Sequence, residues 1–260
     1  MRAYIHAFQG KPWNEECETA YRGFISLGVE CRLFTTNEEL SERNPEDIVV
    51  GGMLIMGQAF SELGIRLPNI DYPDELKDYT GRYIWTVKRE ELAVQRLPVF
   101  IKPVEEKAAK GMVVYCLDDL HEYDHLSPDA EMYCSEVVHF VSEWRCFIRY
   151  GMILGICFYN GDRSIPCRRS VVTAAIKDYK NIPSACSLDF GVTDDGRTLL
   201  IEVNDAVAIG CYGLSDGLYA KLLATRWAEL TGTADQWINE NRKGFVEEAM
   251  EAEAENIGFR

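Results

Sequence analysis

The sequence lacks the features that mark membrane, exported and disulfide-stabilised proteins. None of its apolar runs approaches the roughly 20 residues that a helix needs to cross a bilayer. Its start, Met-Arg-Ala-Tyr-Ile-His, has no long apolar segment of the kind found in signal peptides. The nine cysteines are odd in number and include no CxxC pair, so we expect reduced core thiols rather than disulfides or a zinc site. These absences predict a cytoplasmic protein with no membrane partner.

Positive charge is also scarce. The chain has 27 Lys and Arg residues against 42 Asp and Glu residues, which gives a formal net charge of −15. Such a surface repels polyanions and disfavours nonspecific nucleic-acid binding, although it leaves room for a local cationic pocket. Much of the excess lies late in the chain, where glutamates decorate a helix-like pattern with few apolar residues. We therefore expect residues 234–260 to form an acidic, solvated helical tail.

The pattern of residues 1–233 predicts an α+β fold in two parts. Residues 1–75 alternate short apolar runs with amphipathic stretches, which is typical of a small βα layer. The strands expected there are Ala3–Phe8, Val29–Phe34 and Ile48–Val50, and the helices Glu15–Leu27 and Glu38–Arg43. Two prolines at 67–73 indicate a linker. Residues 76–233 favour mostly antiparallel strands at Pro98–Lys102, Met112–Cys116, Met132–Val138, Glu143–Tyr150 and Met152–Tyr159, with helices at Ser170–Tyr179 and Gly217–Leu230.

The most informative segment runs from Ser187 to Asp205. Two apolar runs flank Asp195-Gly196, a dipeptide that favours a two-residue type I′ hairpin turn. In that register Asp189 lies opposite Glu202, with their Cβ atoms roughly 5 Å apart, and like charges so placed destabilise a sheet unless a positive charge lies between them. Asn204 joins the same face because strand side chains alternate.

Two carboxylates and one amide oxygen form an all-oxygen ligand set. Asp189, Glu202 and Asn204 would therefore suit Mg²⁺ or Mn²⁺ held together with substrate phosphates. The alternative is an acidic, solvated hairpin face with ordinary turn residues. Because a hairpin loop one residue longer would shift the pairing, the interpretation depends on the register.

Several charged residues elsewhere in the chain indicate a nucleotide site only when they are considered together with this hairpin. Lys102 ends an apolar strand and could reach a phosphate, or it could be an ordinary surface lysine. Lys107 and Gly111 belong to a short loop that matches no Walker or GxGxxG pattern. Strand alternation puts Glu143 and Arg145 on one face, where a carboxylate suits ribose hydroxyls and a guanidinium suits phosphate. A cross-strand ion pair on a solvated sheet is the alternative.

The order and spacing of these motifs resemble the ATP-grasp superfamily. The matching motifs are FIKP, a short K/G loop, SEVVHFVSEWRCFI and finally LDFG with LLIEVND, and they are similar to a small clade with an EWR element and a terminal EVN. The preceding segment resembles a pre-ATP-grasp layer. The resemblance implies that Lys102 contacts the α/β phosphates, that Lys107 and Gly111 cover the nucleotide, and that the metals are bound by Asp189, Glu202 and Asn204.

The resemblance also implies an adenine and ribose site. Glu136 and Val138 would lie at the adenine hinge, Glu143 would meet the ribose, and Arg145 would face the phosphates or an acyl-phosphate. The upstream lysine of the superfamily has no counterpart, and the nearby cations are Arg82 and Lys88.

The function that the resemblance implies is Mg-ATP-dependent ligation of a carboxylate to an amine, either of them an amino acid or a peptide, through an acyl-phosphate. The segment Asp205–Asp216, with Tyr212, would line the acceptor side. Two alternatives stay open, namely a phosphotransferase of the same fold and a noncatalytic nucleotide-binding module.

Overall fold

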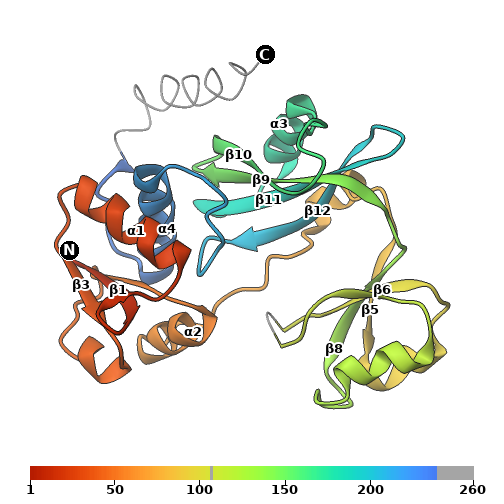
Figure 1. The fold of residues 1–260 in the computed structure, drawn as a ribbon, viewed down its shortest axis with the longest axis horizontal. Coiled ribbons are helices and arrows are strands. Elements are labelled where there is room, and N and C mark those ends of the chain that lie inside the picture. Colours follow the sequence, from red (N-terminus) through yellow and green to blue (C-terminus); the bar gives the residue numbers. More distant parts are fainter. Residues whose placement is uncertain (106–107, 239–260) are drawn as a thin grey trace.

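The structure is a computed structural model that describes residues 1–105 and 108–238. Within this part of the chain the strands form three sheets of four strands each, accompanied by helices, as the predicted α+β class requires. Figure 1 shows the N-terminal sheet and its helices on the left, the large sheet above and the small sheet at lower right. No helix in the described ranges is long and apolar enough to cross a membrane.

The N-terminal layer is a short, mainly parallel sheet with helices. Strand β1 (Ala3–Phe8) pairs in parallel with β3 (Cys31–Phe34) and β4 (Ile48–Val50), and antiparallel with the short β2 (Lys11–Pro12). Helix α1 (Glu15–Ser26) begins at Asn14, whose side chain accepts a hydrogen bond from the Cys17 N–H at 2.9 Å, as a typical N-cap does. Helix α2 (Met53–Glu62) follows β4 directly. A short 3-10 helix covers Asn37–Leu40.

The small sheet is antiparallel and has the strand order β5-β8-β6-β7. Its strands are β5 (Ile84–Lys88), β8 (Glu131–Ser135), β6 (Val99–Pro103) and β7 (Met112–Val114). Further 3-10 helices lie at Asp74–Tyr79, Arg89–Val94 and Leu117–Tyr123. Apolar side chains from the last two and from the strands form the small core beneath the sheet.

The large sheet has the order β10-β9-β11-β12 and is antiparallel throughout. Its strands are β9 (Phe140–Arg149), β10 (Met152–Gly161), β11 (Ala185–Thr193) and β12 (Thr198–Asp205). Helix α3 (Arg169–Asp178) covers one face, where Val172 packs with Cys146 and Leu188. Helix α4 (Asp216–Thr231) covers part of the other face, where Phe147 joins the core. Alternation along β9 thus sends Cys146 and Phe147 into different cores.

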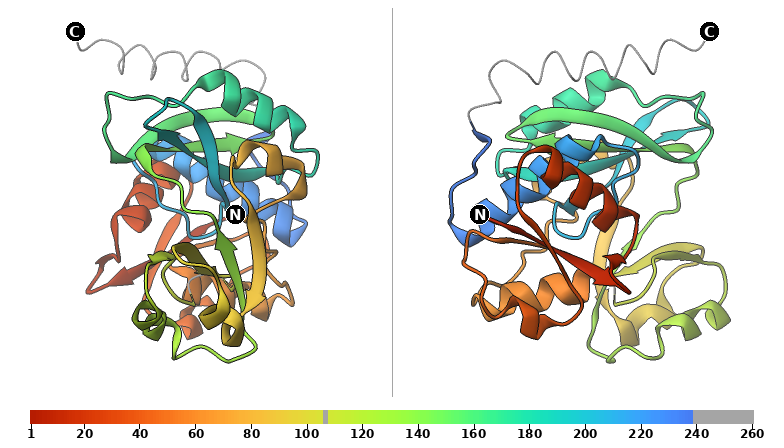
Figure 2. Two further views of the ribbon diagram at one scale, coloured as in Figure 1. Left: turned by 90° about the vertical axis from the view of Figure 1, so that its right-hand side faces the viewer. Right: turned by 60° about the vertical axis from the view of Figure 1, so that its left-hand side comes forward.

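The largest core joins α4 to the N-terminal layer. Helices α1 and α4 lie side by side in Figures 1 and 2. Their contact is so close that a Cβ on Gly23 would lie 2.0 Å from the Asp216 carbonyl oxygen, so only glycine fits there. Trp227 of α4 packs against Phe60 of α2 with ring centroids 4.7 Å apart. The N-terminal layer is therefore packed firmly against the C-terminal helix.

The sequence predicted most of the longer elements within a few residues but missed α2, β5, the short β2 and the 3-10 helices at Asp74–Tyr79 and Arg89–Val94. Helix α2 begins at Gly52 without a side-chain cap and has no acidic residue in its first turn, so the usual start signals are absent. The nine cysteines include no disulfide, and most are buried, in agreement with the prediction of reduced core thiols. Of the predicted acidic tail, residues 239–260 lie outside the described part of the chain.

Candidate active site

The β11–β12 hairpin places Asp189 directly opposite Glu202, as predicted, but by a different route. The expected two-residue type I′ turn is wrong. The Thr193 N–H donates to the Arg197 carbonyl at 2.9 Å, so the loop holds three residues, and within it Gly196 adopts a positive φ of 78°. This is the common three-residue hairpin loop, in which glycine takes the left-handed position.

A β-bulge restores the register that the longer loop would have shifted. Beyond Asp189 and Glu202 the next pair towards the turn is Phe190 with Leu200, so Ile201 is an extra residue on β12. Arg82 braces this bulge, because its guanidinium donates to the Leu200 carbonyl at 2.8 Å and to the Ile201 carbonyl at 2.7 Å. Arg82, one of the two cations near the position of the superfamily's upstream lysine, thus binds backbone carbonyls of β12.

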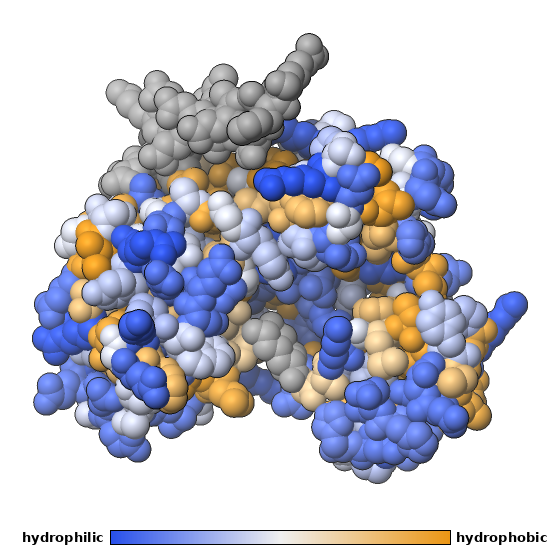
Figure 3. Space-filling view, in the orientation of Figure 1, coloured by the Kyte–Doolittle hydropathy of each residue, from blue (hydrophilic) through white to orange (hydrophobic). Residues whose placement is uncertain are grey.

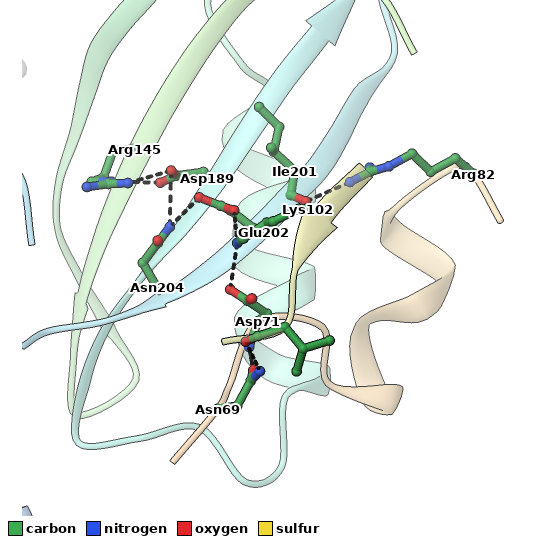
Figure 4. A network of polar contacts seen from close by, with 10 residues as sticks. Asn69, Asp71, Arg82, Lys102, Arg145, Asp189, Ile201, Glu202 and Asn204 are labelled. Carbon is green, nitrogen blue, oxygen red and sulfur yellow. Dashed lines mark hydrogen bonds and ion pairs between the residues drawn. The ribbon is translucent and has the colours of Figure 1, made fainter. Parts of the chain in front are cut away.

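The three predicted metal ligands point toward one another (Figure 4). The Asn204 amide nitrogen donates to an Asp189 oxygen at 3.2 Å and to a Glu202 oxygen at 3.1 Å. It therefore lies between the two carboxylates, in the position where a shared cation would balance their charges. The donor set is all oxygen once the amide turns its carbonyl inward, and so these residues fit a hard divalent cation.

The site offers two carboxylates and one amide rather than a larger group of acidic, histidine or cysteine ligands. No group of three or more His, Cys, Asp or Glu side chains with metal-binding geometry occurs among the described residues. Cations such as Mg²⁺ keep several non-protein ligands and often use only one or two carboxylates together with substrate phosphates. Asp189, Glu202 and Asn204 match that kind of site better than a closed structural metal cage.

Arg145 binds Asp189 through two parallel hydrogen bonds, at 2.8 and 2.7 Å. Both side chains are buried, with exposures of 7% for Arg145 and 1% for Asp189. Burial raises the pKa of Asp189, and Arg145 opposes this only in part. Although burial also disfavours the guanidinium, its bonds to Asp189 hold the pKa of Arg145 above the ordinary value. The short bidentate geometry is that of an ionised pair.

Lys102, at the end of β6, reaches across from the small sheet to the large one. Its ammonium donates to Glu202 at 2.7 Å and to Asp71 at 3.1 Å. Burial disfavours the charge, but the two carboxylates together raise the pKa of Lys102. Burial likewise opposes ionisation of Glu202, yet Lys102, Asn204 and Arg145 together outweigh it and lower the pKa of Glu202. For Asp71 burial dominates and raises the pKa, with Lys102 opposing.

The residues predicted for adenine lie on the connection between the sheets, whereas the predicted ribose residue, Glu143, lies on β9 near Asp189. Glu136 and Val138 occupy the irregular segment 136–139 between β8 and β9. The Glu136 carboxylate accepts the Tyr83 N–H at 2.9 Å, which ties the segment to the start of β5. Glu143 is half-buried near the beginning of β9 and accepts a hydrogen bond from Asn160 at 2.9 Å.

Of the two predicted loop residues, the structure describes one. Gly111 lies just before β7 and packs beside the Phe100 ring and the Lys102 side chain. Lys107 lies outside the described residues. The roles assigned to Lys102, Lys107, Gly111, Glu136, Val138, Glu143, Arg145, Asp189, Glu202 and Asn204 stay predictions.

Sequence reasoning missed Asp71 and understated the aromatic residues around Arg145. Asp71 lies in the segment read as a linker, where an aspartate before Tyr-Pro looks like a turn former. The Arg145 guanidinium lies over the Tyr212 ring, 4.8 Å from its centroid, and 5.9 Å from that of Tyr159. A buried ion pair between Asp205 and Arg226 was also missed, although the predicted metal strand ends at Asp205.

Two cavities adjoin the cluster and meet at Met53, Asn204 and Asp205. The first, about 470 Å³, lies between the N-terminal layer and the β12–α4 loop, and its wall includes Arg145, Tyr212 and Glu16. The second, about 810 Å³, lies between the connecting segment 66–71 and the small sheet. In the space-filling view the surface is hollowed between the N-terminal layer and the small sheet (Figure 3).

Solved structures with this arrangement of sheets include ATP-grasp proteins, and this chain has their fold. D-cycloserine synthetase DcsG superposes with a TM-score of 0.57 at 11% identity, over 86% of this chain and 99% of that one. D-alanine–D-alanine ligase from Bacillus anthracis gives 0.53 at 14% identity, over 98% and 99%. The ATP-grasp ligase PsnB with a minimal precursor gives 0.51 at 13% identity, over 86% and 98%.

The family follows from the sequence of the ATP-grasp part. The family described as "ATP-grasp domain, R2K clade family 2" matches residues 79–222, more than half of the chain, and the protein belongs to that family. The resemblance drawn from FIKP, EWR and EVN is thereby confirmed. No curated protein sequence matches the chain.

Proposed function

We propose that this protein is a Mg-ATP-dependent ligase that joins a carboxylate to an amine through an acyl-phosphate. The observation that carries the proposal is the convergence of Asp189, Glu202 and Asn204 beside two buried cations, Lys102 and Arg145. Phosphoryl transfer needs positioned charge more than a protein nucleophile. A divalent cation bound by the three residues would supply neutralisation of the nucleotide phosphates.

The two cations are fixed in place before any substrate arrives. Arg145 uses two of its five N–H donors on Asp189, which leaves others for a phosphate or acyl-phosphate oxygen. Lys102 extends from the small sheet to the large one, so it would contact a nucleotide held between them. Donors that need no rearrangement stabilise charge as it develops in the transition state.

In this reaction an oxygen of the substrate carboxylate attacks the γ-phosphorus, and ADP leaves. The amine nitrogen then attacks the acyl carbon, inorganic phosphate leaves, and the amine gives up a proton. The first cavity would hold the acceptor, because Arg145 and Asn204 form part of its wall. Glu16, which also lines this cavity and forms no ion pair within the described residues, would suit an ammonium group.

Two comparisons support the proposal without deciding the substrates. One structure with this fold is D-alanine–D-alanine ligase complexed with ATP, at a TM-score of 0.52 and 13% identity. Another is an ATP-grasp ligase complexed with a minimal precursor. Small amino acids are therefore the first substrates to test, and we propose peptides as the next class.

The test is a turnover screen with Mg-ATP and pooled carboxylates and amines, with ADP, phosphate and new amides read by mass spectrometry. Glu202→Gln should lower turnover on the order of 100-fold, since it removes a charged ligand while Lys102 keeps Asp71 as partner. Glu122→Gln, an exposed glutamate outside the site, is the matched control.

Each outcome of the screen has a distinct meaning. Equal turnover of wild type and Glu202→Gln would contradict the site. Equal ATP consumption with and without amine, with phosphate retained on the acceptor, would instead identify a phosphotransferase. Tight ATP binding without turnover across the pools would identify a nucleotide-binding module.

A further inference from the structure

The segment that connects the N-terminal layer to the small sheet passes through the site and is bonded to both sheets there. The Asn69 side chain donates to the Val104 carbonyl at 3.0 Å, at the end of β6. The Asp71 N–H donates to the Asn69 side chain at 3.0 Å, and the Asp71 carbonyl accepts the Val203 N–H of β12 at 2.9 Å. The position of Asp71 is therefore fixed by its backbone, independently of its carboxylate.

The Asp71 carboxylate is directed at Lys102 (Figure 4). It is 8% exposed, and within the described residues the Lys102 ammonium, at 3.1 Å, is its hydrogen-bond donor. The Tyr72 ring lies on another side of that ammonium, with its centroid 5.9 Å away. Lys102 is thus held by Asp71 and Tyr72 from the connecting segment, and by Glu202 from the large sheet.

This arrangement leaves the site with an excess of negative charge. Three carboxylates (Asp71, Asp189 and Glu202) form ion pairs with two cations (Lys102 and Arg145), which leaves one net negative charge. Two further charges act on this cluster, Arg82 on Glu202 and Glu143 on Asp189, and they cancel each other. A free nucleoside triphosphate is a tetra-anion and is repelled by that charge. The same nucleotide with a divalent cation brings positive charge that offsets the excess negative charge of the cluster.

We propose that Asp71 is the residue that makes nucleotide binding depend on the bound divalent cation. The proposal rests on the proposed function. When the cation engages Glu202, Lys102 loses that partner, and Asp71 keeps the ammonium in place to meet a phosphate oxygen. When no cation is present, Asp71 adds to the repulsion of the phosphates. Asp71 is therefore a positioning residue that selects metal-bound over free nucleotide.

The test is equilibrium binding of ATP to the full chain, measured by titration calorimetry with Mg²⁺ and with EDTA at about pH 8, where carboxylates are ionised. Asp71→Asn keeps the shape and the backbone bonds but removes the charge. Free ATP should bind about tenfold more tightly to the variant, because a nearby like charge is gone. Mg-ATP should bind no more tightly, because Lys102 is less well positioned. The dissociation constant of free ATP divided by that of Mg-ATP should therefore fall about tenfold.

Asp74→Asn is the matched control, since Asp74 is an exposed carboxylate three positions along the same segment. It should leave the ratio within about twofold of wild type, as expected for a solvent-screened charge. An unchanged ratio in Asp71→Asn, or an equal gain for both forms of ATP, would overturn the inference. Absence of ATP binding to the wild type under both conditions would instead contradict the proposed function.

Discussion

At the scale of single residues, the site is organised by a buried aspartate and the arginine that neutralises it. Asp189 lies in the middle of the large sheet, where an isolated charge would be strongly unfavourable. Arg145 compensates with two hydrogen bonds and is held in turn by the Tyr212 ring. The pair therefore fixes the orientation of a potential metal ligand and of a phosphate-binding cation at once.

Removal of Arg145 should be costly to stability as well as to activity. We expect Arg145→Met to lower the free energy of unfolding by about 3 kcal/mol, because Asp189 is left buried without a partner. Urea unfolding followed by circular dichroism measures this effect. The double variant Arg145→Met/Asp189→Leu should regain most of the stability, since a buried ion pair can be replaced by apolar side chains, yet it should stay inactive.

Arg197→Met is the matched control for this experiment. Arg197 pairs with Asp195 in the hairpin loop, and both side chains are more than half exposed, at 56% each. Loss of such a pair should leave the unfolding midpoint unchanged within error. If Arg145→Met also unfolded at the wild-type midpoint, the ion pair would not be the source of stability that its geometry indicates.

The residues of this cluster were predictable from sequence to different degrees. Asp189, Glu202 and Asn204 could be placed on one face because strands alternate and because a hairpin pairs residues that are close in sequence. Asp71 could not, since its partner Lys102 is 31 positions away and no local pattern links them.

At the scale of elements, the β11–β12 hairpin has two irregularities that offset each other, one in its loop and one in strand β12. The hairpin loop is one residue longer than the sequence suggested, and the bulge at Ile201 adds one residue to the same strand. Together they return Glu202 to the position opposite Asp189. The bulge leaves backbone carbonyls that need donors, and Arg82 supplies them from outside the sheet.

Arg82 should therefore control the alignment of the site through β12. We expect Arg82→Met to cost about 2 kcal/mol of stability, because two backbone carbonyls lose their charged donor. Turnover should fall by more than the loss of folded protein accounts for, since Glu202 adjoins the bulge and would lose its alignment. Urea unfolding and amide hydrogen exchange along β12 measure the two effects.

Arg96→Met, an exposed arginine of the small sheet region, is the control for loss of charge alone. Wild-type exchange rates for Ile201 and Glu202 in the Arg82 variant would show that the bulge holds without its brace. This irregularity was beyond prediction, because a bulge depends on a donor that arrives from 119 positions away in the chain.

At the scale of the whole molecule, the N-terminal layer and the ATP-grasp part share one core. Trp227 of α4 packs against Phe60, with the two rings tilted by 38°, and donates to the Pro45 carbonyl at 2.9 Å. Arg22 of α1 binds Asp216 at the start of α4, at 2.7 Å. The division of the chain at residue 75 stays a prediction about sequence units, but the core runs across it.

Residues 76–233 alone should therefore fail to fold cooperatively. Without the N-terminal layer, α4 exposes the apolar face that fills the largest core, which is a substantial loss of buried area. We expect this fragment to bind a hydrophobic dye and to lack near-UV circular dichroism, whereas the full chain does neither. Co-expression with residues 1–75 should restore a sharp unfolding transition. A sharp transition of the fragment by itself would show that the layer is dispensable.

The sequence by itself determined the periodicity of the strands and helices, the hairpin that carries Asp189 and Glu202, and the motifs that define the family. These properties depend on residues near one another in the chain, where alternation and turn chemistry apply directly. Only the tertiary structure decided that Lys102 meets Asp71, that Arg82 braces β12 and that α4 belongs to the N-terminal core. Such contacts join distant segments, and their geometry is set by packing and charge balance that no local pattern encodes.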